Sequence, residues 1–419
     1  MKREPLLQLT TRMECLNAPA TKINAMQRRS FLAASALWLA NSTYGIERDT
    51  TAQRRVAVIG HTGRGNYGHG LDVVWKRIPE AQIVAVADGN AAGLAKELKK
   101  LGVDQGYTDF RKMLAEVKPE FVSVAPRHAD QHHDMALAAI ESGVKGLYVE
   151  KPFCRTPAEA DSLIAACKEH HAKLAVAHRN RYHPTLAQID KVIDSGELGK
   201  LLQIRGRGKG DRRGGGEDLW VLGSHILNLI HYFAGAPTSC SATMLLNGKP
   251  VSARDVQPGA EGLGPLAANE LHARYETKKG IVAYYDSIAN DDTGGNAYCL
   301  QLIGSKGIVT LHIDRDPVAH LTPGNPFHPT STPRPWIPIT TAGVGMPESQ
   351  PEKVAEVHNH VLAVRDLIEA VDRDREPLCG VHDGALTVEM ICAVFESHRQ
   401  GGKSVQFPLQ ERGNALEKL

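Results

Sequence analysis

Apolar residues first follow a regular pattern near residue 54 of this 419-residue chain. Continuous apolar runs recur at 55–60, 82–88, 121–126 and 147–149, with amphipathic stretches between them. A strand that is apolar at consecutive positions is buried on both faces, which is typical of a parallel sheet covered by helices. The pattern therefore predicts βα repeats up to residue 150, and Leu71–Ile78 is expected to open the first helix.

The second half of the chain has a different pattern. Short apolar or alternating runs fill residues 269–313, and 299–304 is separated from 307–311 by only two residues, which predicts an antiparallel hairpin. Helical apolar stripes mark 354–370 and 383–399. Prolines crowd residues 320–351, where we expect a long semi-rigid loop that borders the site. The predicted class is α/β, with a parallel-sheet domain followed by an α+β domain whose sheet is mainly antiparallel.

A glycine-rich turn follows the first predicted strand. Bare backbone amides and the positive end of a following helix can hold a pyrophosphate, so we expect a Rossmann dinucleotide-binding domain at 54–178 and a substrate domain at 179–419. Two registers are open, because Gly63-x-Gly65-x-x-Gly68 matches the pattern literally whereas Gly60 follows the strand at once. The second register is preferred, and a glycine-rich surface loop is the alternative. The expected cofactor contacts here are Gly60, Thr62, Gly63, Arg64 and Gly65.

Asp88 ends the second predicted strand, 28 positions after Gly60. A carboxylate there accepts hydrogen bonds from the adenosine ribose and repels a 2′-phosphate, so the sequence favours NAD over NADP. The alternative is that Asp88 only caps the helix that begins near Ala91.

Lys151 stands where the 147–149 run ends in Glu-Lys-Pro. Open α/β sheets bind ligands at this end of their strands, and Pro152 restricts Lys151 to extended geometry. Lys151 is therefore a candidate for proton transfer, although a surface lysine before a helix-starting proline has the same local pattern. We expect Pro126, His128 and Glu150 to border the cofactor at the same edge.

Metal binding is not expected. His128, His132 and His133 lie close together, but no carboxylate or cysteine joins them at metal-ligand spacing, so we interpret them as solvated histidines at a helix start. The seven cysteines form no Cys-x-x-Cys pair.

The order of these features resembles the Gfo/Idh/MocA family of oxidoreductases, named for glucose-fructose oxidoreductase, inositol dehydrogenase and a rhizopine catabolism protein. The resemblance runs from about Arg54 to Pro408 and includes 174–184, which is similar to the family's strand and His/Asn-x-x-Arg segment. In the family, the Glu-Lys-Pro lysine lies beside the nicotinamide and serves in proton transfer, which by position is Lys151. The resemblance also implies Arg179 as a cofactor contact.

Residues 214–225 resemble the glycine loop and helix that face this lysine in the family. The family places an Asp four residues before a His; His225 fits, but Val221 occupies the Asp position. Asp218 or Asn228, each one helical turn from one of these positions, could supply the missing polar group, and His225 could instead be an ordinary polar residue on an amphipathic helix. The candidate catalytic residues are Lys151, His225 and Asp218, and the candidate substrate contacts are Arg181, Tyr182, Arg212, Arg213 and Asn228.

Charge argues against nucleic-acid binding. The chain has a formal net charge of +2, and residues 1–45 alone carry six Lys/Arg and two Asp/Glu, a net +4, so the remainder is −2. No basic body is left to neutralise a polyphosphate backbone.

The same 45 residues have the layout of a twin-arginine export signal. Arg28-Arg29 precedes a mostly apolar run at 31–40 that is too short to span a bilayer. We therefore expect an exported, periplasmic protein with no membrane span; a basic tail with a chance Arg-Arg pair is the alternative.

The resemblance implies hydride transfer between NAD and a hydroxyl of a sugar or cyclic polyol, with Lys151 taking the proton. Two other classes stay open: an NAD-dependent glycoside-cleaving enzyme that oxidises a ring hydroxyl transiently, and a catalytically silent relative, which the Val221 substitution favours. We also expect a homo-oligomer formed through the C-terminal sheet.

Overall fold

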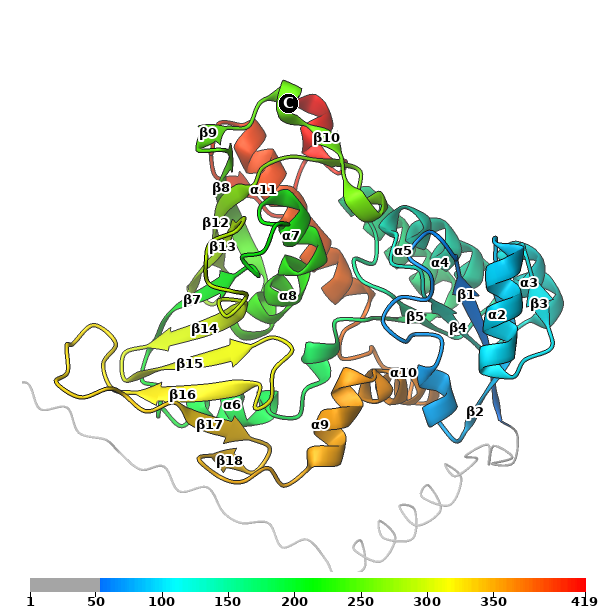
Figure 1. The fold of residues 1–419 in the computed structure, drawn as a ribbon, viewed down its shortest axis with the longest axis horizontal. Helices are drawn as coiled ribbons and strands as arrows, with labels where there is room; N and C mark the ends of the chain where they lie inside the picture. Colours follow the sequence, from blue (N-terminus) through cyan, green and yellow to red (C-terminus); the bar gives the residue numbers. More distant parts are fainter. Residues whose placement is uncertain (1–52) are drawn as a thin grey trace, which may run out of the picture. The chain divides into compact units, whose positions relative to one another are not determined.

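The computed structural model describes residues 53–419. Its N-terminal half is a sheet of six parallel strands in the order β3-β2-β1-β4-β5-β6 (Figure 1). The strands are β1 (Arg54–Gly60), β2 (Ala81–Asp88), β3 (Gly106–Tyr107), β4 (Phe121–Val124), β5 (Gly146–Val149) and β6 (Lys173–Val176). The helices are η1 (Val74–Arg77), α2 (Ala91–Leu101), α3 (Phe110–Val117), η2 (Ala129–Gln131), α4 (His132–Glu141) and α5 (Pro157–His170). All residues of β4 and β5 are buried, which confirms the predicted parallel-sheet domain.

The first predicted helix is wrong. Residues 62–73 form turns, and only the short 3-10 helix η1 follows them. Gly68 and Gly70 have φ of +60° and +95°, in the left-handed region that no right-handed helix uses. Ile78 is extended, as the residue before a proline tends to be, so the segment is closed to a helix at both ends.

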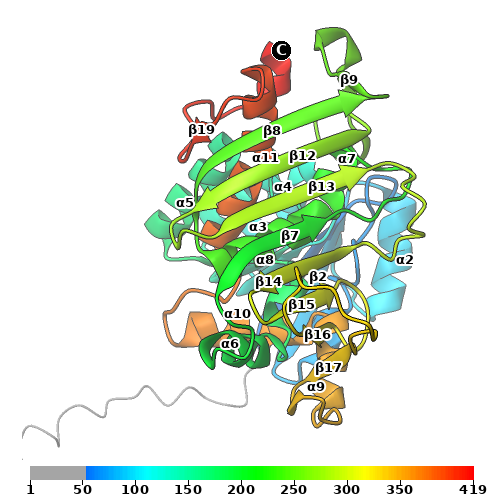
Figure 2. The same cartoon turned by 90° about the vertical axis from the view of Figure 1, so that its left-hand side faces the viewer.

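The C-terminal half is built on an eleven-stranded sheet, which Figure 2 shows in front of its helices. The order is β18-β17-β16-β15-β14-β7-β13-β12-β8-β19, with β9 beside β8, and only β7 and β13 pair in parallel. The strands are β7 (Leu201–Arg207), β8 (Pro237–Leu246), β9 (Lys249–Pro250), β12 (Glu270–Thr277), β13 (Val282–Ile288), β14 (Cys299–Gly304), β15 (Gly307–His312), β16 (Ala319–Pro323), β17 (Ile337–Thr340), β18 (Gly343–Val344) and β19 (Val405–Gln406). The mainly antiparallel sheet and the β14–β15 hairpin are thus confirmed.

The proline-rich segment is partly strand. Residues 320–351 were expected to be a loop, but β16, β17 and β18 extend the sheet there by antiparallel pairing. Pro338 and Pro323 are accommodated near the sheet edge, where a missing backbone N–H breaks few ladder bonds. A small two-stranded sheet, β10 (Gln257–Pro258) with β11 (Pro265–Leu266), lies outside the large one.

The helices after β6 are η3 (Arg179–Tyr182), α6 (Leu186–Asp194), α7 (Gly216–Val221), α8 (Gly223–Ala234), η4 (Ala253–Asp255), η5 (Ala260–Gly262), α9 (Pro351–His358), α10 (Val361–Asp372), α11 (Val381–Arg399) and η6 (Ala415–Lys418). Helix α11 packs on β8 and α8 of the second half and on α5 and β6 of the first, and α10 packs on β5 and β6 (Figure 1). Helix α11 therefore joins the two halves.

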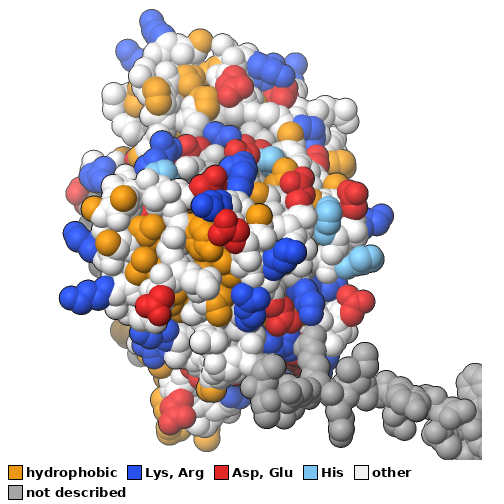
Figure 3. All heavy atoms as spheres, turned by 90° about the vertical axis from the view of Figure 1, so that its right-hand side faces the viewer, with side chains coloured by type: hydrophobic (Ala, Val, Ile, Leu, Met, Phe, Trp, Pro, Cys, Tyr) orange, Lys and Arg blue, Asp and Glu red, His pale blue; other side chains and the backbone are white. Residues whose placement is uncertain are grey.

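The surface around the N-terminal half carries both signs of charge. On the face drawn in Figure 3, Lys and Arg side chains are interspersed with Asp and Glu. Within residues 53–419, no helix is long and apolar enough to cross a membrane. The twin-arginine segment lies outside the described residues.

Candidate active site

A cavity lies at the carboxyl end of β5. Its lining comes from the turn after β1, the segments that follow β5 and β6, the α7–α8 junction, the loop between β15 and β16, and the start of α10. The lining residues are His69, Glu150, Lys151, Ala177, Arg179, Leu222, His225, Asp314 and His360. Segments far apart in the sequence thus meet around Lys151.

Lys151 is buried, with 7% of its surface exposed. Its Nζ donates a hydrogen bond to the main-chain carbonyl of Val221 at 2.8 Å. Burial lowers the pKa of this ammonium, and the charge of Glu150 acts in the opposite direction. The lysine is therefore held in one place and gives up a proton more readily than a surface lysine.

The carbonyl of Val221 is available because a helix ends there. Helix α7 stops at Val221, and the amide of His225, which would continue the ladder, bonds to Leu222 instead. The last carbonyls of a helix have no intrahelical partner, so this one can accept from Lys151. Val221 thus holds Lys151 through its backbone oxygen, although its own side chain is apolar.

Glu150 connects the glycine turn to the lysine strand. Its side chain is 1% exposed and accepts from the Nδ1 of His69 at 3.1 Å and from the His69 amide at 3.4 Å. Burial would raise the pKa of this carboxyl, but the His69 hydrogen bond and the charge of Lys151 bring it to about 2. Gly68 is required here, because a Cβ would lie 2.7 Å from Glu150 Oε2.

Two histidines face each other beside Lys151. The rings of His178 and His225 make an edge-on contact with centroids 5.3 Å apart. Burial and the charge of Lys151 lower the pKa of His178 to about 3 and that of His225 well below its usual value. Both rings are therefore neutral near pH 7, and the Nδ1 of each has no hydrogen-bond partner among residues 53–419.

His360 completes the cavity from the start of α10. Its Nδ1 lies 2.6 Å from the hydroxyl of Tyr148 on β5, and both side chains are buried. Burial lowers the pKa of His360 to about 4. Its Nε2 has no partner in the described part of the chain.

Both halves of the chain match the models of one protein family. The profile of the oxidoreductase family with an NAD-binding Rossmann fold (Gfo/Idh/MocA) matches residues 54–178, and that of the family's C-terminal alpha/beta domain matches residues 191–407. The chain belongs to the Gfo/Idh/MocA oxidoreductase family.

Relatives with assigned activities are distant. Levoglucosan dehydrogenase of Pseudarthrobacter phenanthrenivorans is 23% identical over 57% of this chain and 66% of its own length. The NAD(+)-dependent scyllo-inositol 2-dehydrogenase of Bacillus subtilis is 31% identical over 37% of this chain and 44% of its own length. The matches thus span less than two-thirds of either relative.

Solved structures share the fold. A levoglucosan dehydrogenase complex with NADH and levoglucosan superposes with a TM-score of 0.67 at 19% identity, covering 85% of this chain and 99% of the other. An NAD-binding oxidoreductase from Klebsiella pneumoniae gives a TM-score of 0.64 at 18% identity, covering 85% and 99%.

Asp218 does not join the Lys151 cavity. Its carboxylate is fully buried and accepts hydrogen bonds from the hydroxyls of Tyr285 (2.8 Å) and Ser287 (2.6 Å) and from the amide of Lys209 (3.3 Å). Burial raises its pKa, which these hydrogen bonds partly oppose. The carboxylate fastens the glycine loop and α7 to strand β13, and it is absent from the cavity lining.

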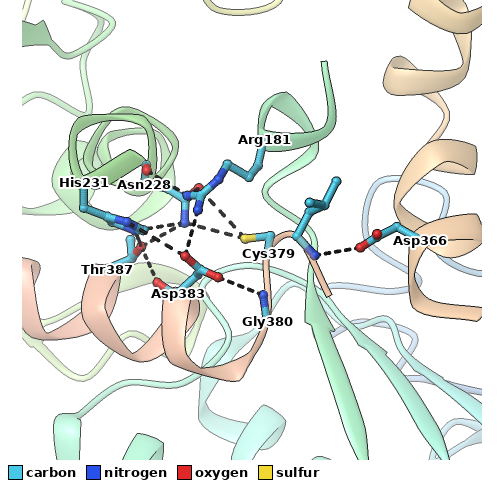
Figure 4. Close-up of polar contacts among 9 residues, drawn as sticks. Arg181, Asn228, His231, Asp366, Cys379, Gly380, Asp383 and Thr387 are labelled. Atoms are coloured by element: carbon cyan, nitrogen blue, oxygen red, sulfur yellow. Dashed lines mark hydrogen bonds and ion pairs between the residues drawn. The ribbon is translucent and has the colours of Figure 1, made fainter. Parts of the chain in front are cut away.

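Arg181 and Asn228 belong to a buried network. Arg181 donates to Asp383 (2.8 Å) and to Asn228 (3.2 Å), and the Asn228 amide donates to Thr387 (3.1 Å), with His231 close by (Figure 4). These contacts tie η3, α8 and α11 together. The structure therefore places both residues in the joint between the halves and outside the cavity lining.

The other candidate substrate residues are also outside that lining. Tyr182 is buried, and its hydroxyl has no side-chain partner among the described residues. Arg213 pairs with Asp211, and this hydrogen bond lowers the pKa of the Asp211 carboxyl to about 2. Arg212 is exposed.

A second cavity lies at the carboxyl ends of β1 and β2. Its lining residues are Ile59, Gly60, His61, Ala87, Asp88, Gly89, Thr108, Asp109, Phe110, Gln131 and Met135. Gly60 and Asp88, both expected at the cofactor, thus share one cavity. Gly60 leaves no room for a side chain, because a Cβ would lie 2.1 Å from the Tyr67 ring.

Asp88 is held from within the protein. Its carboxylate accepts from the amide and hydroxyl of Thr62 (3.0 and 2.7 Å), from the Tyr67 hydroxyl (2.8 Å) and from the Asn90 amide (2.8 Å). Burial raises its pKa, but these hydrogen bonds outweigh burial and keep the carboxylate charged. The helix cap of α2 is Asn90, whose side chain accepts from Gly93.

Of the remaining expected cofactor contacts, Gly63, Arg64 and Gly65 belong to the glycine turn, and Arg179 lines the Lys151 cavity. Gly65 has φ of +85°, and a Cβ on it would lie 2.3 Å from the Arg127 amide, so the turn packs directly on the loop after β4. A Cβ on Gly63 would meet nothing within 4 Å. Arg64 pairs with Asp130, and Arg179 pairs with Asp314 and donates to the His358 carbonyl.

One expectation about histidines is wrong. His132 is completely buried, and its ring nitrogens lie 2.7 Å and 2.6 Å from the carbonyls of Pro152 and Pro126. It therefore joins the Glu-Lys-Pro turn to the loop after β4. His128 is half-buried near the same loop, and its Nδ1 has no partner in residues 53–419.

Sequence reasoning missed three lining residues, His69, Asp314 and His360. It also missed His178, whose ring makes an edge-on contact with that of the lining residue His225. His69 follows a glycine of the turn and His178 follows the β6 strand, so position at a strand or turn end could have marked both. Asp314 and His360 come from loops of the C-terminal half, and no local pattern distinguishes them.

Proposed function

We propose that this protein is an NAD-dependent dehydrogenase of a sugar or cyclic polyol, in which Lys151 takes the proton of the reacting hydroxyl. The observation that carries the proposal is the buried Lys151, held on the Val221 carbonyl in a cavity at the carboxyl end of the parallel sheet. Family membership and the dehydrogenase names of the relatives support it.

The residues present fit NAD. The second cavity opens beside Gly60 at the ends of β1 and β2, where a Rossmann fold receives adenosine, and the bare Gly65 lets the turn approach the loop after β4. Gly60 and Asp88 would hold the adenosine end, and the turn from Thr62 to Gly65 would hold the pyrophosphate. NAD, when bound, takes up the hydride released from the carbinol carbon.

The charge of Asp88 supports NAD over NADP. All four donor groups that bond to this carboxylate stabilise its ionised form, so a negative charge is fixed beside the second cavity. A 2′-phosphate brought there is repelled.

The proton follows a separate route. Oxidation of a carbinol to a carbonyl removes one hydride from carbon and one proton from oxygen, so a base must lie within hydrogen-bond reach of the hydroxyl. Lys151 in its neutral form accepts that proton at Nζ and becomes the ammonium, which donates to the Val221 carbonyl. His178 and His225 remain neutral and orient the hydroxyl through their ring nitrogens.

The cavity chemistry suits a polyol. Neutral imidazoles both donate and accept, and the lining adds the Arg179 guanidinium and the Asp314 carboxylate. Such a set matches adjacent hydroxyl groups better than an apolar ligand.

Turnover with a panel of sugars, polyols and aryl glycosides tests the proposal. NADH formation is followed at 340 nm, and aglycone release is measured in parallel. NADH formation supports a dehydrogenase. Aglycone release without net NADH would show that the reaction is redox-assisted glycoside cleavage. Binding of NAD without either reaction would identify a catalytically silent relative.

We also propose export by the twin-arginine route and assembly through the C-terminal sheet. Arg28-Arg29 and the apolar run after it support export. The broad sheet face in Figure 2, away from the helices, supports an interface between copies. Arg28→Lys with Arg29→Lys should leave the protein in the cytoplasm, and sedimentation should show an oligomer.

A further inference from the structure

We propose that His360, fixed by Tyr148, is a further substrate-contacting residue of this site and donates a hydrogen bond from Nε2 to the reacting oxygen. The inference rests on the proposed function. It concerns a residue that lies 2.6 Å from a buried tyrosine hydroxyl and lines the same cavity as Lys151 and His225.

The direction of the Tyr148–His360 hydrogen bond defines the tautomer. Tyr148 is completely buried on β5, and its hydroxyl has no second acceptor among residues 53–419. The hydroxyl therefore donates to Nδ1, because otherwise its own proton would have no acceptor. A neutral imidazole that accepts at Nδ1 carries its proton at Nε2.

The Nε2–H group is then a donor without a partner. His360 is 3% exposed, and its Nε2 has no hydrogen-bond partner in the described part of the chain. Leaving a buried donor unpaired costs free energy, so such groups are usually satisfied by a ligand or water when they border a cavity. Here the cavity is the one that contains the Lys151 ammonium.

This donor complements Lys151. As the hydroxyl proton moves to Lys151, negative charge develops on the substrate oxygen, and a fixed neutral donor stabilises that charge without competing for the proton. Burial keeps the pKa of His360 near 4, so the ring does not act as the base at neutral pH. Val221 has no polar side chain that could donate to the substrate oxygen. His360 lines the site from the start of α10 and can do so.

The backbone at His360 makes a clean test possible. Its φ is +65°, a conformation that glycine adopts without strain, so His360→Gly removes the ring and leaves the backbone relaxed. His171 provides a matched control, because it also has a positive φ (+53°) but is exposed at the end of α5.

The assay uses NAD⁺ with levoglucosan and scyllo-inositol as probes, and with any further substrate that the panel identifies. His360→Gly should lower kcat/KM about 100-fold, the effect of removing one donor to a developing oxyanion. Free imidazole should raise the kcat/KM of His360→Gly at least tenfold, because it can occupy the space left by the side chain. Neither change should occur in His171→Gly, and imidazole should not rescue Lys151→Ala.

A second measurement does not depend on turnover. In protein labelled with ¹⁵N-histidine, the His360 signals, assigned by their loss in His360→Gly, should show the Nε2–H tautomer, and Tyr148→Phe should convert them to a mixture. An Nδ1–H tautomer in the wild type would overturn the proposal. A kcat/KM in His360→Gly equal to that of the wild type would also overturn it. If the wild type shows the Nε2–H tautomer but turns over no substrate, the proposed function is rejected and the assignment of His360 as a donor remains supported.

Discussion

The Nζ of Lys151 and the main-chain carbonyl of Val221 lie 2.8 Å apart, on a strand end of the Rossmann half and a helix end of the substrate half. Where the family pattern has an aspartate, this chain therefore holds its lysine on a backbone oxygen. A carbonyl carries no net charge, so it positions the ammonium without stabilising it as strongly as a carboxylate would.

Restoring the aspartate should shift the pH dependence of the reaction. Val221→Asp adds a negative charge on the residue whose main-chain carbonyl accepts from Lys151, which favours the charged lysine and raises its pKa. Because the neutral lysine is the base, the acidic limb of kcat/KM should move to higher pH by about one unit, which lowers activity about tenfold on that limb. Val221→Asn is the uncharged control, and a profile that is the same in both variants would contradict the account.

Removing the charge at Asp88 should weaken the preference for NAD. Asp88→Asn keeps the shape of the side chain but removes the repulsion of a 2′-phosphate, so the ratio of NAD to NADP affinity should fall by about tenfold. Titration of both nucleotides into the variant measures this ratio, with the exposed Asp104→Asn as the control. A ratio unchanged from the wild type would mean that Asp88 only holds Thr62 and Tyr67.

Glu150 should stabilise the fold in a defined pH range. Its pKa is about 2 in the folded protein and near 4.5 in the unfolded chain, so its contribution of about 3 kcal/mol is present above pH 4.5 and is lost as the pH falls toward 2. Glu150→Gln should therefore lower the free energy of unfolding at pH 7, and the difference from the wild type should shrink below pH 4.5. Urea denaturation measures this.

The matched control for Glu150 is the exposed Glu197→Gln, which should change the free energy of unfolding little at any pH. A Glu150→Gln difference that stays constant from pH 7 to pH 3 would show that the loss comes from packing and not from the ionised carboxylate.

Arg181 should act on stability and not on substrate affinity. Its bonds to Asp383 and Asn228 join η3, α8 and α11, so Arg181→Gln should lower the free energy of unfolding by about 2 kcal/mol, between the values for exposed and buried pairs. The KM for the substrate should change less than twofold. The exposed Arg212→Gln is the stability control, and a raised KM with unchanged stability would return Arg181 to the substrate site.

The parallel strands were predictable because burial on both faces leaves continuous apolar runs, as at Phe121–Val124. The error at Leu71–Ile78 was not predictable, because the apolar spacing there is helical. The left-handed φ of Gly70 just before this segment and the extended Ile78 at its end limit it to the short helix η1. Strands β16–β18 were hidden by prolines that an edge of a sheet can tolerate.

The site was predictable only where a strand or helix carries a local motif. Lys151 and His225 follow from such motifs and share a cavity. Asp218 and Asn228 have suitable spacing, but buried partners on β13 and α11 already occupy their polar atoms. His360 enters the cavity through long-range packing of α10 on β5, which leaves no pattern near residue 360.

The turnover of Lys151→Ala tests the central claim most directly, with Lys151→Arg beside it and the exposed Lys145→Ala as the control from the same strand region. If Lys151 is the base, kcat on the substrate found in the panel should fall by about 10² to 10⁴, while melting temperature and NAD affinity stay close to the wild type. Lys151→Arg should be nearly as impaired, because a guanidinium keeps its proton. Full activity in a folded, NAD-binding Lys151→Ala protein would contradict the account.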